Sequence, residues 1–242
     1  MPVAAAKTLT GQPYWTHPAH RTTGGPNVNA MTVRAGAACC VAAVLLTGCT
    51  QWADGVPLRA LSEPPYHPPG IVDVDHVMLT QAQMQAITGG GQDVTVIPTM
   101  DGKSMVDVES LAESVPRDCR FVFAETDTFG TDVEDFHKTS FQYPSRRALI
   151  SQGAAAYRDG VTAQHAFNTL STAVHRCAEE SMGASLVGDV DGTVDSLRTR
   201  PGRCGRDYRL KTSVLVEVTF CAFPESVPEI VMTNILNKIP GG

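Results

Sequence analysis

Residues 158–182 of this chain read RDGVTAQHAFNTLSTAVHRCAEESM. Apolar side chains recur in this stretch at spacings of 4, 3, 4 and 3 residues, in the order Ala163, Phe167, Leu170, Val174 and Cys177. That spacing places them on one stripe of an α-helix and leaves most polar residues on other faces. Arg158-Asp159-Gly160, in front of the stripe, is typical of a turn. The pattern predicts a long helix from Thr162 to Met182 with one buried face.

Several segments around this helix have the composition of β-strands. β-Branched residues, which favour strands, are dense in the sequence SVLVEVTF, so a strand is predicted from Tyr208 to Phe223. The dipeptide Asp191-Gly192 predicts a hairpin of two short strands within Ser185–Leu197. Further strands are predicted at Arg120–Ala124, Thr139–Tyr143 and Arg147–Tyr157, with a helix as the alternative for the alanine-rich last segment.

Capping signals predict two more helices. Thr80 and Gln83 form a capping box at the start of one helix, and Gly89 supplies the residue that ends it. Ser226 and Glu229 form a similar box near the C-terminus. The segment from Gln92 to Ser114 alternates weakly and is expected to be loop with short elements. These patterns predict an α+β domain at residues 71–242, with an antiparallel sheet and helices packed on one of its faces.

The residues before this domain have the features of an export signal. In Met31–Cys49 (MTVRAGAACCVAAVLLTGC), the cation Arg34 is followed by an uncharged run that ends in Leu46-Thr47-Gly48-Cys49. Those four residues resemble the lipobox of bacterial lipoproteins, whose cysteine is acylated and becomes the new N-terminus. The alternatives are a transmembrane or apolar core helix, but the run is too short to cross about 30 Å of hydrocarbon. A signal segment is therefore predicted at residues 1–48, with a lipid on Cys49.

The flanks of this signal carry two further predictions. Residues 1–30 show no helical or strand period, so we expect Met31 to be the true start, with an unusually long leading region as the alternative. Residues 49–70 contain five prolines after the acylated cysteine. Such a composition favours an extended, semi-rigid tether between the membrane and the domain.

Charge excludes some classes of partner. The chain has 19 Lys and Arg residues against 25 Asp and Glu, a net charge of −6. Removal of residues 1–48 would take away three cations and no acid, which leaves a net charge of −9. An acidic domain without a basic block repels nucleic acid and anionic lipid headgroups. Contact with the membrane is therefore expected through the lipid anchor alone.

Cysteine usage agrees with export. Of the seven cysteines, Cys39 and Cys40 lie inside the predicted signal and Cys49 would carry the lipid. The four that remain, at positions 119, 177, 204 and 221, predict two disulfides with three possible connectivities. No Cys-x-x-Cys pair occurs among them, so the spacing does not indicate a zinc or redox site.

Other polar motifs favour structural interpretations. Gly102-Lys103-Ser104 matches the end of a phosphate-binding loop, but the required glycine five residues earlier is Ile97. The acidic run 189–195 lacks the glycine and glutamate positions of a calcium loop, so a hairpin turn is preferred. Asp73, Asp75 and His76 are expected on a solvated strand edge, and His165 and His175 on separate helix faces. No catalytic residue, metal site or cofactor is predicted.

The order of these segments and the four cysteines resemble one known family. The matching features are Leu79-Thr80 followed by Met84, the sequence ISQGAAAY at 150–157, the helix leading into Cys177, and the strand with Cys221. Together they resemble the PknH-like extracellular sensor domain over about residues 77–240. Members often carry Trp where this chain has Val174. The resemblance implies an α+β fold with a ligand cleft, and it implies the disulfides Cys119–Cys177 and Cys204–Cys221.

The function expected from these observations is that of a non-catalytic sensor. The chain would be a lipid-anchored lipoprotein on the extracytoplasmic face of the cell membrane, and its domain would bind a small molecule or an envelope component. A structural lipoprotein that contacts another envelope protein is the alternative. The binding surface is expected between the sheet and the helix Thr162–Met182, with residues that the sequence does not identify. The acidic charge favours a neutral or cationic ligand.

Overall fold

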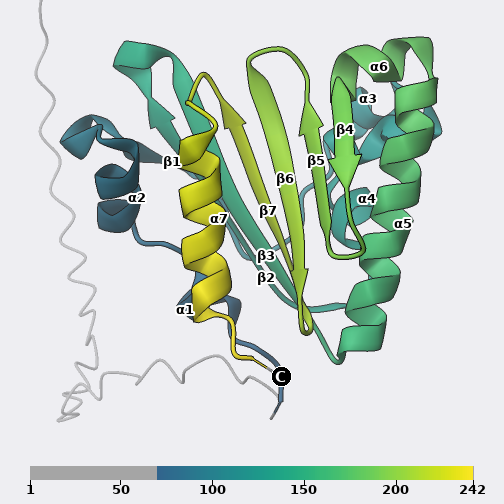
Figure 1. Cartoon of the computed structure of the whole chain (residues 1–242), viewed down its shortest axis with the longest axis horizontal. Coiled ribbons are helices and arrows are strands. Elements are labelled where there is room, and N and C mark those ends of the chain that lie inside the picture. The colour runs from purple at the N-terminus through teal and green to yellow at the C-terminus, as the bar shows by residue number, and fades with distance from the viewer. Residues whose placement is uncertain (1–69, 242) are drawn as a thin grey trace, which may run out of the picture. The chain divides into compact units, whose positions relative to one another are not determined.

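The computed structural model describes residues 70–241, whose centre is one seven-stranded antiparallel sheet (Figure 1). The strands are β1 (Thr95–Gly102), β2 (Val133–Tyr143), β3 (Ala148–Tyr157), β4 (Asp189–Gly192), β5 (Ser196–Arg200), β6 (Cys204–Lys211) and β7 (Val214–Cys221). Their order across the sheet is β1-β2-β3-β7-β6-β5-β4. After β3 the chain passes through two helices, enters the far edge as β4 and returns strand by strand to β7, beside β3.

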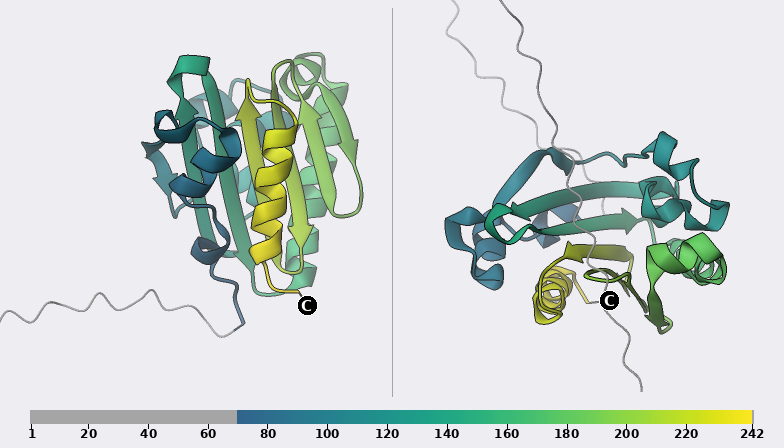
Figure 2. Two further views of the ribbon diagram at one scale, coloured as in Figure 1. Left: turned by 60° about the vertical axis from the view of Figure 1, so that its left-hand side comes forward. Right: turned by 90° about the horizontal axis from the view of Figure 1, so that it is seen from above.

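Helices lie on both faces of this sheet (Figures 1 and 2). One face is covered by α1 (Val74–Val77), α2 (Gln81–Thr88) and α7 (Ser226–Lys238). The other is covered by α4 (Glu125–Phe129), α5 (Gly160–Glu179), α6 (Ser181–Val187) and the 3₁₀-helix η2 (Arg117–Val122). The short elements α3 (Glu109–Ala112), η1 (Gly91–Asp93) and η3 (Pro144–Arg146) complete the described chain.

Alternation along the central strands explains why both faces are covered. In β3, Ala154 and Ala156 belong to the core under α7, whereas Ala155 and Tyr157 belong to the core under α5. Successive residues of a strand point to opposite faces, so a strand that is apolar throughout must be buried on both sides. The predicted α+β class and antiparallel sheet are confirmed. The detail that differs is the placement of the helices, which are divided between the two faces rather than gathered on one.

The long helix forms as its apolar spacing predicts, but it runs from Gly160 to Glu179, and the last predicted residues, Ser181 and Met182, belong to α6. Asp159 is the N-cap of α5, and its side chain accepts a hydrogen bond from the backbone N–H of Thr162 at 2.8 Å. The five residues of the predicted stripe are all buried, each with at most 1% of its surface exposed.

Within residues 70–241, no helix is both long and apolar enough to span a membrane. The predicted signal segment and tether up to residue 69 lie outside the described residues.

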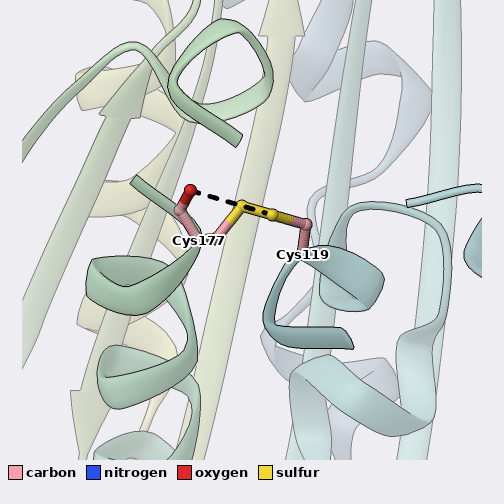
Figure 3. Close-up of a disulfide and its surroundings, with 2 residues drawn as sticks. All are labelled: Cys119 and Cys177. Atoms are coloured by element: carbon pink, nitrogen blue, oxygen red, sulfur yellow. Dashed lines mark hydrogen bonds between the residues drawn. A yellow bond between two sulfur atoms is a disulfide. The ribbon is translucent and has the colours of Figure 1, made fainter. Parts of the chain in front are cut away.

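Two disulfides tie the domain together. They join Cys119 to Cys177 and Cys204 to Cys221, which confirms the implied pairing. The first links η2 to the end of α5 (Figure 3), and the backbone oxygen of Cys177 lies 3.8 Å from the sulfur of Cys119. Gly183 of α6 packs directly against this bridge. A Cβ atom at Gly183 would stand 1.7 Å from the Cys177 carbonyl oxygen, so only glycine permits the approach.

The helix-capping prediction is confirmed at α2 and is wrong at α7. The capping box of Thr80 and Gln83 is present, and Gly89 ends α2 in the left-handed conformation. At the C-terminal helix, by contrast, Glu225 is the N-cap and Ser226 is already the first helical residue, without a side-chain cap. The predicted Ser226 cap is therefore wrong. The Val227 N–H bonds to the Pro224 carbonyl oxygen at 2.9 Å, which starts the helical turn one residue earlier.

Four segments differ from their predicted structure. Residues 120–122 end the 3₁₀-helix η2, Phe123 is its C-cap, and Ala124 makes a single bridge to Asp107, so the predicted strand 120–124 is wrong. The predicted strand 208–223 is two strands, because the chain reverses between β6 and β7 at Thr212, which has a positive φ of 52°. A hairpin of β4 and β5 is present, but its turn falls at residues 193–195, because Asp191 and Gly192 pair with β5 as the last residues of β4. Residues 185–187, predicted as strand, belong to α6. Finally, the expected loop 92–114 contains the edge strand β1. Because β1 is largely exposed and contains Pro98, its sequence does not alternate between apolar and polar residues as a half-buried strand would.

Candidate functional site

A cavity of about 380 Å³ opens on the face of the sheet that carries α5. Its floor comes from β2, β3, β6 and β7, its roof from residues 121–128, and its rim from residues 99–108. The space between the sheet and α5 is filled by the second core, including Phe167, Leu170 and Val174. The cavity therefore lies beside α5, whereas the binding surface expected from the sequence lies between the sheet and the helix Thr162–Met182.

Small side chains in one row across the sheet create the hollow. In this row Ser140 of β2 pairs with Ser151 of β3, Ser151 pairs with Thr219 of β7, and Thr219 pairs with Arg206 of β6. The hydroxyls of Ser140 and Ser151 are 3.1 Å apart and satisfy each other. Three short side chains in sequence cannot reach the roof above them. The volume that larger apolar residues would occupy is left open.

The neighbouring row supplies charge to the floor. Lys138 of β2 pairs with Gly153 of β3, Gly153 with Glu217 of β7, and Glu217 with Tyr208 of β6. The Lys138 ammonium crosses above Gly153 and lies 2.8 Å from the Glu217 carboxylate. One row further on, the side chains of Phe136, Ala155, Leu215 and Leu210 belong to the second core. The charged row thus marks the boundary between the filled core and the open cavity.

Two further ionic groups complete this cluster. The Lys138 ammonium also lies 3.0 Å from a carboxylate oxygen of Glu125, the first residue of α4. The Arg206 guanidinium lies 3.4 Å from Glu217, on the side opposite Lys138. Only 1% of the Glu217 side chain is exposed, and the other three are mostly buried. Two cations and two anions therefore balance one another: Lys138, Arg206 and Glu125 line the cavity, and Glu217 is buried among them.

The cluster keeps its charges although it is buried. Burial alone would raise the pKa of Glu217, but the charges of Lys138 and Arg206 outweigh burial and hold that pKa below its usual value. Burial would lower the pKa of Lys138, yet Glu217 and Glu125 raise it above its usual value. Burial raises the pKa of the Tyr208 phenol, so this group stays neutral. At neutral pH the floor holds ionised pairs rather than a single free charge.

The roof is held in place from two sides. From below, the Arg206 guanidinium donates to the backbone carbonyl oxygen of Val122 at 2.8 Å and to that of Phe121 at 3.5 Å. The Thr128 hydroxyl also donates to the Phe121 oxygen, at 3.0 Å. From the side, the disulfide of Cys119 joins η2 to α5. These contacts fix the 3₁₀ turn at a set height over the hydroxyl row.

The rim is formed by a bulge in β1 and by the loop that follows it. β1 pairs with β2 at Thr95 and Val96 and again at Asp101 and Gly102, with a register shift between them, so residues 97–100 bulge away from β2. The loop is anchored to α4, because the Val106 N–H donates to the Glu125 carboxylate at 2.7 Å. Three rim residues that line the cavity, Met100, Val106 and Val108, are among the exposed large apolar residues of the described chain.

A second polar cluster fastens the outer side of this rim. Both ring nitrogens of His137 face carboxylates, with Nδ1 at 2.8 Å from Asp75 and Nε2 at 2.9 Å from Asp101. The Thr139 hydroxyl donates to Asp101 at 2.8 Å, and the Lys103 ammonium pairs with Asp75. Because Asp75 lies in α1 and Asp101 in β1, the cluster connects the start of the domain to the strand that forms the rim. Within residues 70–241, no group of His, Cys, Asp or Glu side chains is arranged to hold a metal ion.

Several other residues named from the sequence lie away from the cavity or outside the described residues. Cys49, the predicted acylation site, lies outside the described residues. Asp73 is the N-cap of helix α1, with His76 2.5 Å from its carboxylate, so the predicted strand edge at this point is wrong. His165 lines a second hollow of about 420 Å³ between α5, η2 and α4. The ring of His175 bonds to the Ser171 carbonyl oxygen. Residues 189–195 form the β4–β5 hairpin and its turn.

The residues that build the floor were not found by sequence motifs. Lys138, Arg206 and Glu217 come from three strands and share no short spacing. One local signal was available, since Glu217 interrupts the apolar run of β7, and a charge inside such a strand is rarely buried unless paired. Its partners depend on the strand order, which the sequence pattern did not give.

Comparison with known proteins agrees with this fold. A model of the PknH-like extracellular domain family matches residues 72–239. Among solved structures, the chain is similar to the crystal structure of the extracellular domain of PknH from Mycobacterium tuberculosis, with a TM-score of 0.53 and 15% sequence identity. That similarity covers 69% of this chain and 96% of the other chain, and at this identity it shows a common fold. No curated protein matches the chain.

Proposed function

This chain belongs to the PknH-like extracellular domain family, and on that premise we propose that it is a lipid-anchored receptor without catalytic activity. Its domain, like the family, is extracytoplasmic. In this proposal a small molecule binds in the cavity between the hydroxyl row of the sheet and η2. The membrane is contacted through a lipid on Cys49, for which the support is the sequence Leu46-Thr47-Gly48-Cys49.

The observation that carries the proposal is the composition of the cavity. Its walls are mainly apolar, from residues such as Phe121, Val122 and Leu149, while a few polar groups converge on the floor. A concave, largely apolar site with a few placed polar groups is the usual form of a small-molecule site, and about 380 Å³ lies within the range of such sites. The cavity is also supported by rigid elements. Two disulfides and a hydrogen-bonded roof reduce the entropy lost on binding.

One observation favours a second candidate function, the binding of an envelope protein. Met100, Val106 and Val108 at the rim and Leu111 of the adjacent α3 are between 44% and 61% exposed. Neighbouring apolar side chains on a surface are a feature of protein interfaces. The same residues also surround an open cavity, however, which a flat protein surface would leave unfilled. We therefore place small-molecule binding first.

Thermal-shift screening of the domain against envelope lipids, sugars and peptides tests the proposal. We expect at least one class of compound to raise the melting temperature of the wild-type domain. The variant Val108→Asp should lose that response, because it places a charge on the cavity wall. Val108 is the N-cap residue of α3, a position where Asp is favourable, so this variant should fold.

The matched control is Val194→Asp, a change at an exposed residue in the β4–β5 turn that is 83% exposed. It should respond as the wild type does. A flat response of the wild-type domain across the library, together with a stable protein partner captured from envelope extracts, would contradict the proposal and support the second candidate.

A further inference from the structure

The charge balance of the cavity floor points to the chemical class of its ligand. We infer that the cavity takes an uncharged amphiphile, a molecule with an apolar body and a hydroxyl or carbonyl oxygen that accepts a hydrogen bond from Lys138. This inference rests on the proposed function, since it presupposes that the cavity binds a small molecule. It narrows that function to one kind of ligand.

Existing ion pairs leave no unbalanced charge for an ionic ligand. Lys138 is paired with Glu217 and Glu125, and Arg206 with Glu217 and with the carbonyl oxygens of the roof. A carboxylate ligand would have to compete with Glu125 for Lys138 and would enter a site that already holds two anions. An ammonium ligand would be repelled by the Lys138 ammonium and would have to compete with it for Glu125 and Glu217. In either case a charge must be desolvated without a free partner, which is costly in an apolar site.

Lys138 nevertheless has a hydrogen-bond donor available. An ammonium group has three N–H donors. Two of those of Lys138 are accounted for by Glu217 at 2.8 Å and Glu125 at 3.0 Å, and no third acceptor is found within residues 70–241. Lys138 lines the cavity, so a ligand oxygen can take the remaining donor. A neutral oxygen satisfies this donor without disturbing either ion pair.

The walls and rim indicate that the rest of the ligand is apolar. Above the floor the lining includes Phe121, Val122, Leu149, Met100, Val106 and Val108. The last three are exposed at the rim, so the apolar surface continues from the cavity to solvent. Each apolar Å² of ligand and wall that loses water contributes about 25 cal/mol. An alkyl or other apolar body that reaches from the floor to the rim would cover this surface.

Three probes with the same alkyl chain and different heads test the inference. 1-Octanol, octanoate and octylammonium, each below its aggregation concentration at neutral pH, are titrated into isotopically labelled domain and followed by amide NMR shifts. We expect 1-octanol to bind at least about tenfold more tightly than either ion, a difference of about 1.4 kcal/mol. Its largest shifts should fall in residues 99–108, 121–128 and around Lys138.

Two variants locate the binding. Val108→Asp should weaken 1-octanol binding at least about fivefold, by opposing apolar contact at the wall, whereas Val194→Asp should leave it unchanged. Equal or tighter binding of octanoate or octylammonium, or no binding of 1-octanol, would overturn the ligand class. Shifts outside the cavity, or equal binding by Val108→Asp, would overturn the site. These outcomes are distinct from a failure of the proposed function, which the compound library tests independently of head-group charge.

Discussion

Lys138 and Glu217 form an ion pair of 2.8 Å although a whole strand lies between them. They stand on β2 and β7, and the residue opposite both of them on the intervening β3 is Gly153. Since Gly153 has no side chain, the Lys138 chain can lie across β3 and bring its ammonium group to Glu217. The nearest Lys138 carbon would be 3.5 Å from a Cβ atom at Gly153. The absence of a large side chain at residue 153 thus lets Lys138 reach and pair the buried charge of β7.

Removal of the Glu217 charge should destabilise the domain strongly. In Glu217→Gln, Lys138 and Arg206 lose their shared buried anion, and breaking such a pair costs about 3 to 5 kcal/mol. The matched control is Glu225→Gln, because Glu225 also pairs with an arginine, Arg200 at 3.0 Å, but is 63% exposed. That change should cost less than about 1 kcal/mol. Denaturant unfolding at neutral pH measures both, and equal losses would contradict the role assigned to the buried pair.

Substitutions at Gly153 should show that a small side chain is tolerated there and a large one is not. Gly153→Ala places a Cβ at ordinary contact distances of 3.5 to 3.6 Å, so it should be neutral or stabilise by up to about 1 kcal/mol. Gly153→Leu would occupy the path of the Lys138 side chain and should destabilise by about 3 kcal/mol or more through overpacking and loss of the ion pair. Unfolding free energies of the two variants provide the comparison. If leucine were tolerated as well as alanine, Lys138 would not need the open position.

The two disulfides should differ in their effect on the cavity. Loss of the 58-residue link in Cys119→Ala/Cys177→Ala should cost about 4 kcal/mol, and loss of the 17-residue link in Cys204→Ala/Cys221→Ala about 3 kcal/mol. Only the first bridge holds η2. Hydrogen exchange in residues 117–128 should therefore rise sharply in the first variant and much less in the second. Similar exchange in the two variants would show that Arg206 alone is sufficient to hold the roof.

Sequence patterns predicted the elements whose cause is local. The α5 stripe is a property of one helix, and the Thr80 capping box needs only four consecutive residues, so both were predictable. The residues Phe121, Val122 and Phe123 suggest a strand by composition, but a short apolar run does not distinguish strand from helix. Their 3₁₀ turn is stabilised by the Arg206 guanidinium, about 85 residues away in sequence, and by a disulfide.

The cavity could not be predicted because it depends on register. Ser140, Ser151 and Thr219 are unremarkable in sequence and become a hollow only when β2, β3 and β7 align them in one row. A shift of one residue in either pairing would turn these hydroxyls to the α7 face. Strand order and register therefore determine the site, and neither follows from periodicity within single strands. Only Glu217, a charge inside an apolar strand, signalled that such a row existed.

The lipid anchor is testable by a single substitution. Cys49→Ala removes the predicted acylation site at the end of Leu46-Thr47-Gly48-Cys49. We expect the variant protein to leave the membrane fraction or to remain at its unprocessed length, because a single residue carries the anchor. Fractionation and mass spectrometry of the full chain, with Cys39→Ala as a control inside the predicted signal, measure this. Membrane partitioning and mass like those of the unsubstituted protein would contradict the anchor.

The His137 cluster should produce a defined dependence on pH. The hydrogen bond from His137 is the main reason that the pKa of Asp101 lies below its usual value, and Lys103 and His137 outweigh burial to lower the pKa of Asp75. A carboxylate whose pKa is lower in the folded state stabilises the fold above its unfolded pKa of about 3.9. That contribution is lost as pH falls through the lower, folded pKa. The domain should therefore lose part of its stability below about pH 4.

In His137→Phe, the Asp101 carboxylate loses its largest stabilising contact, so we expect its pKa to rise toward the usual value for aspartate. Asp159 is an internal control, because its pKa is lowered chiefly by the backbone N–H of Thr162 in α5, and His137 is not among the groups that shift it. Carboxyl ¹³C titration of both residues in one sample measures the change. The unfolding free energy of the variant should also fall less between neutral pH and pH 3 than that of the wild type. An unchanged Asp101 pKa would show that Thr139, which donates to the same oxygen at 2.8 Å, is sufficient to hold it.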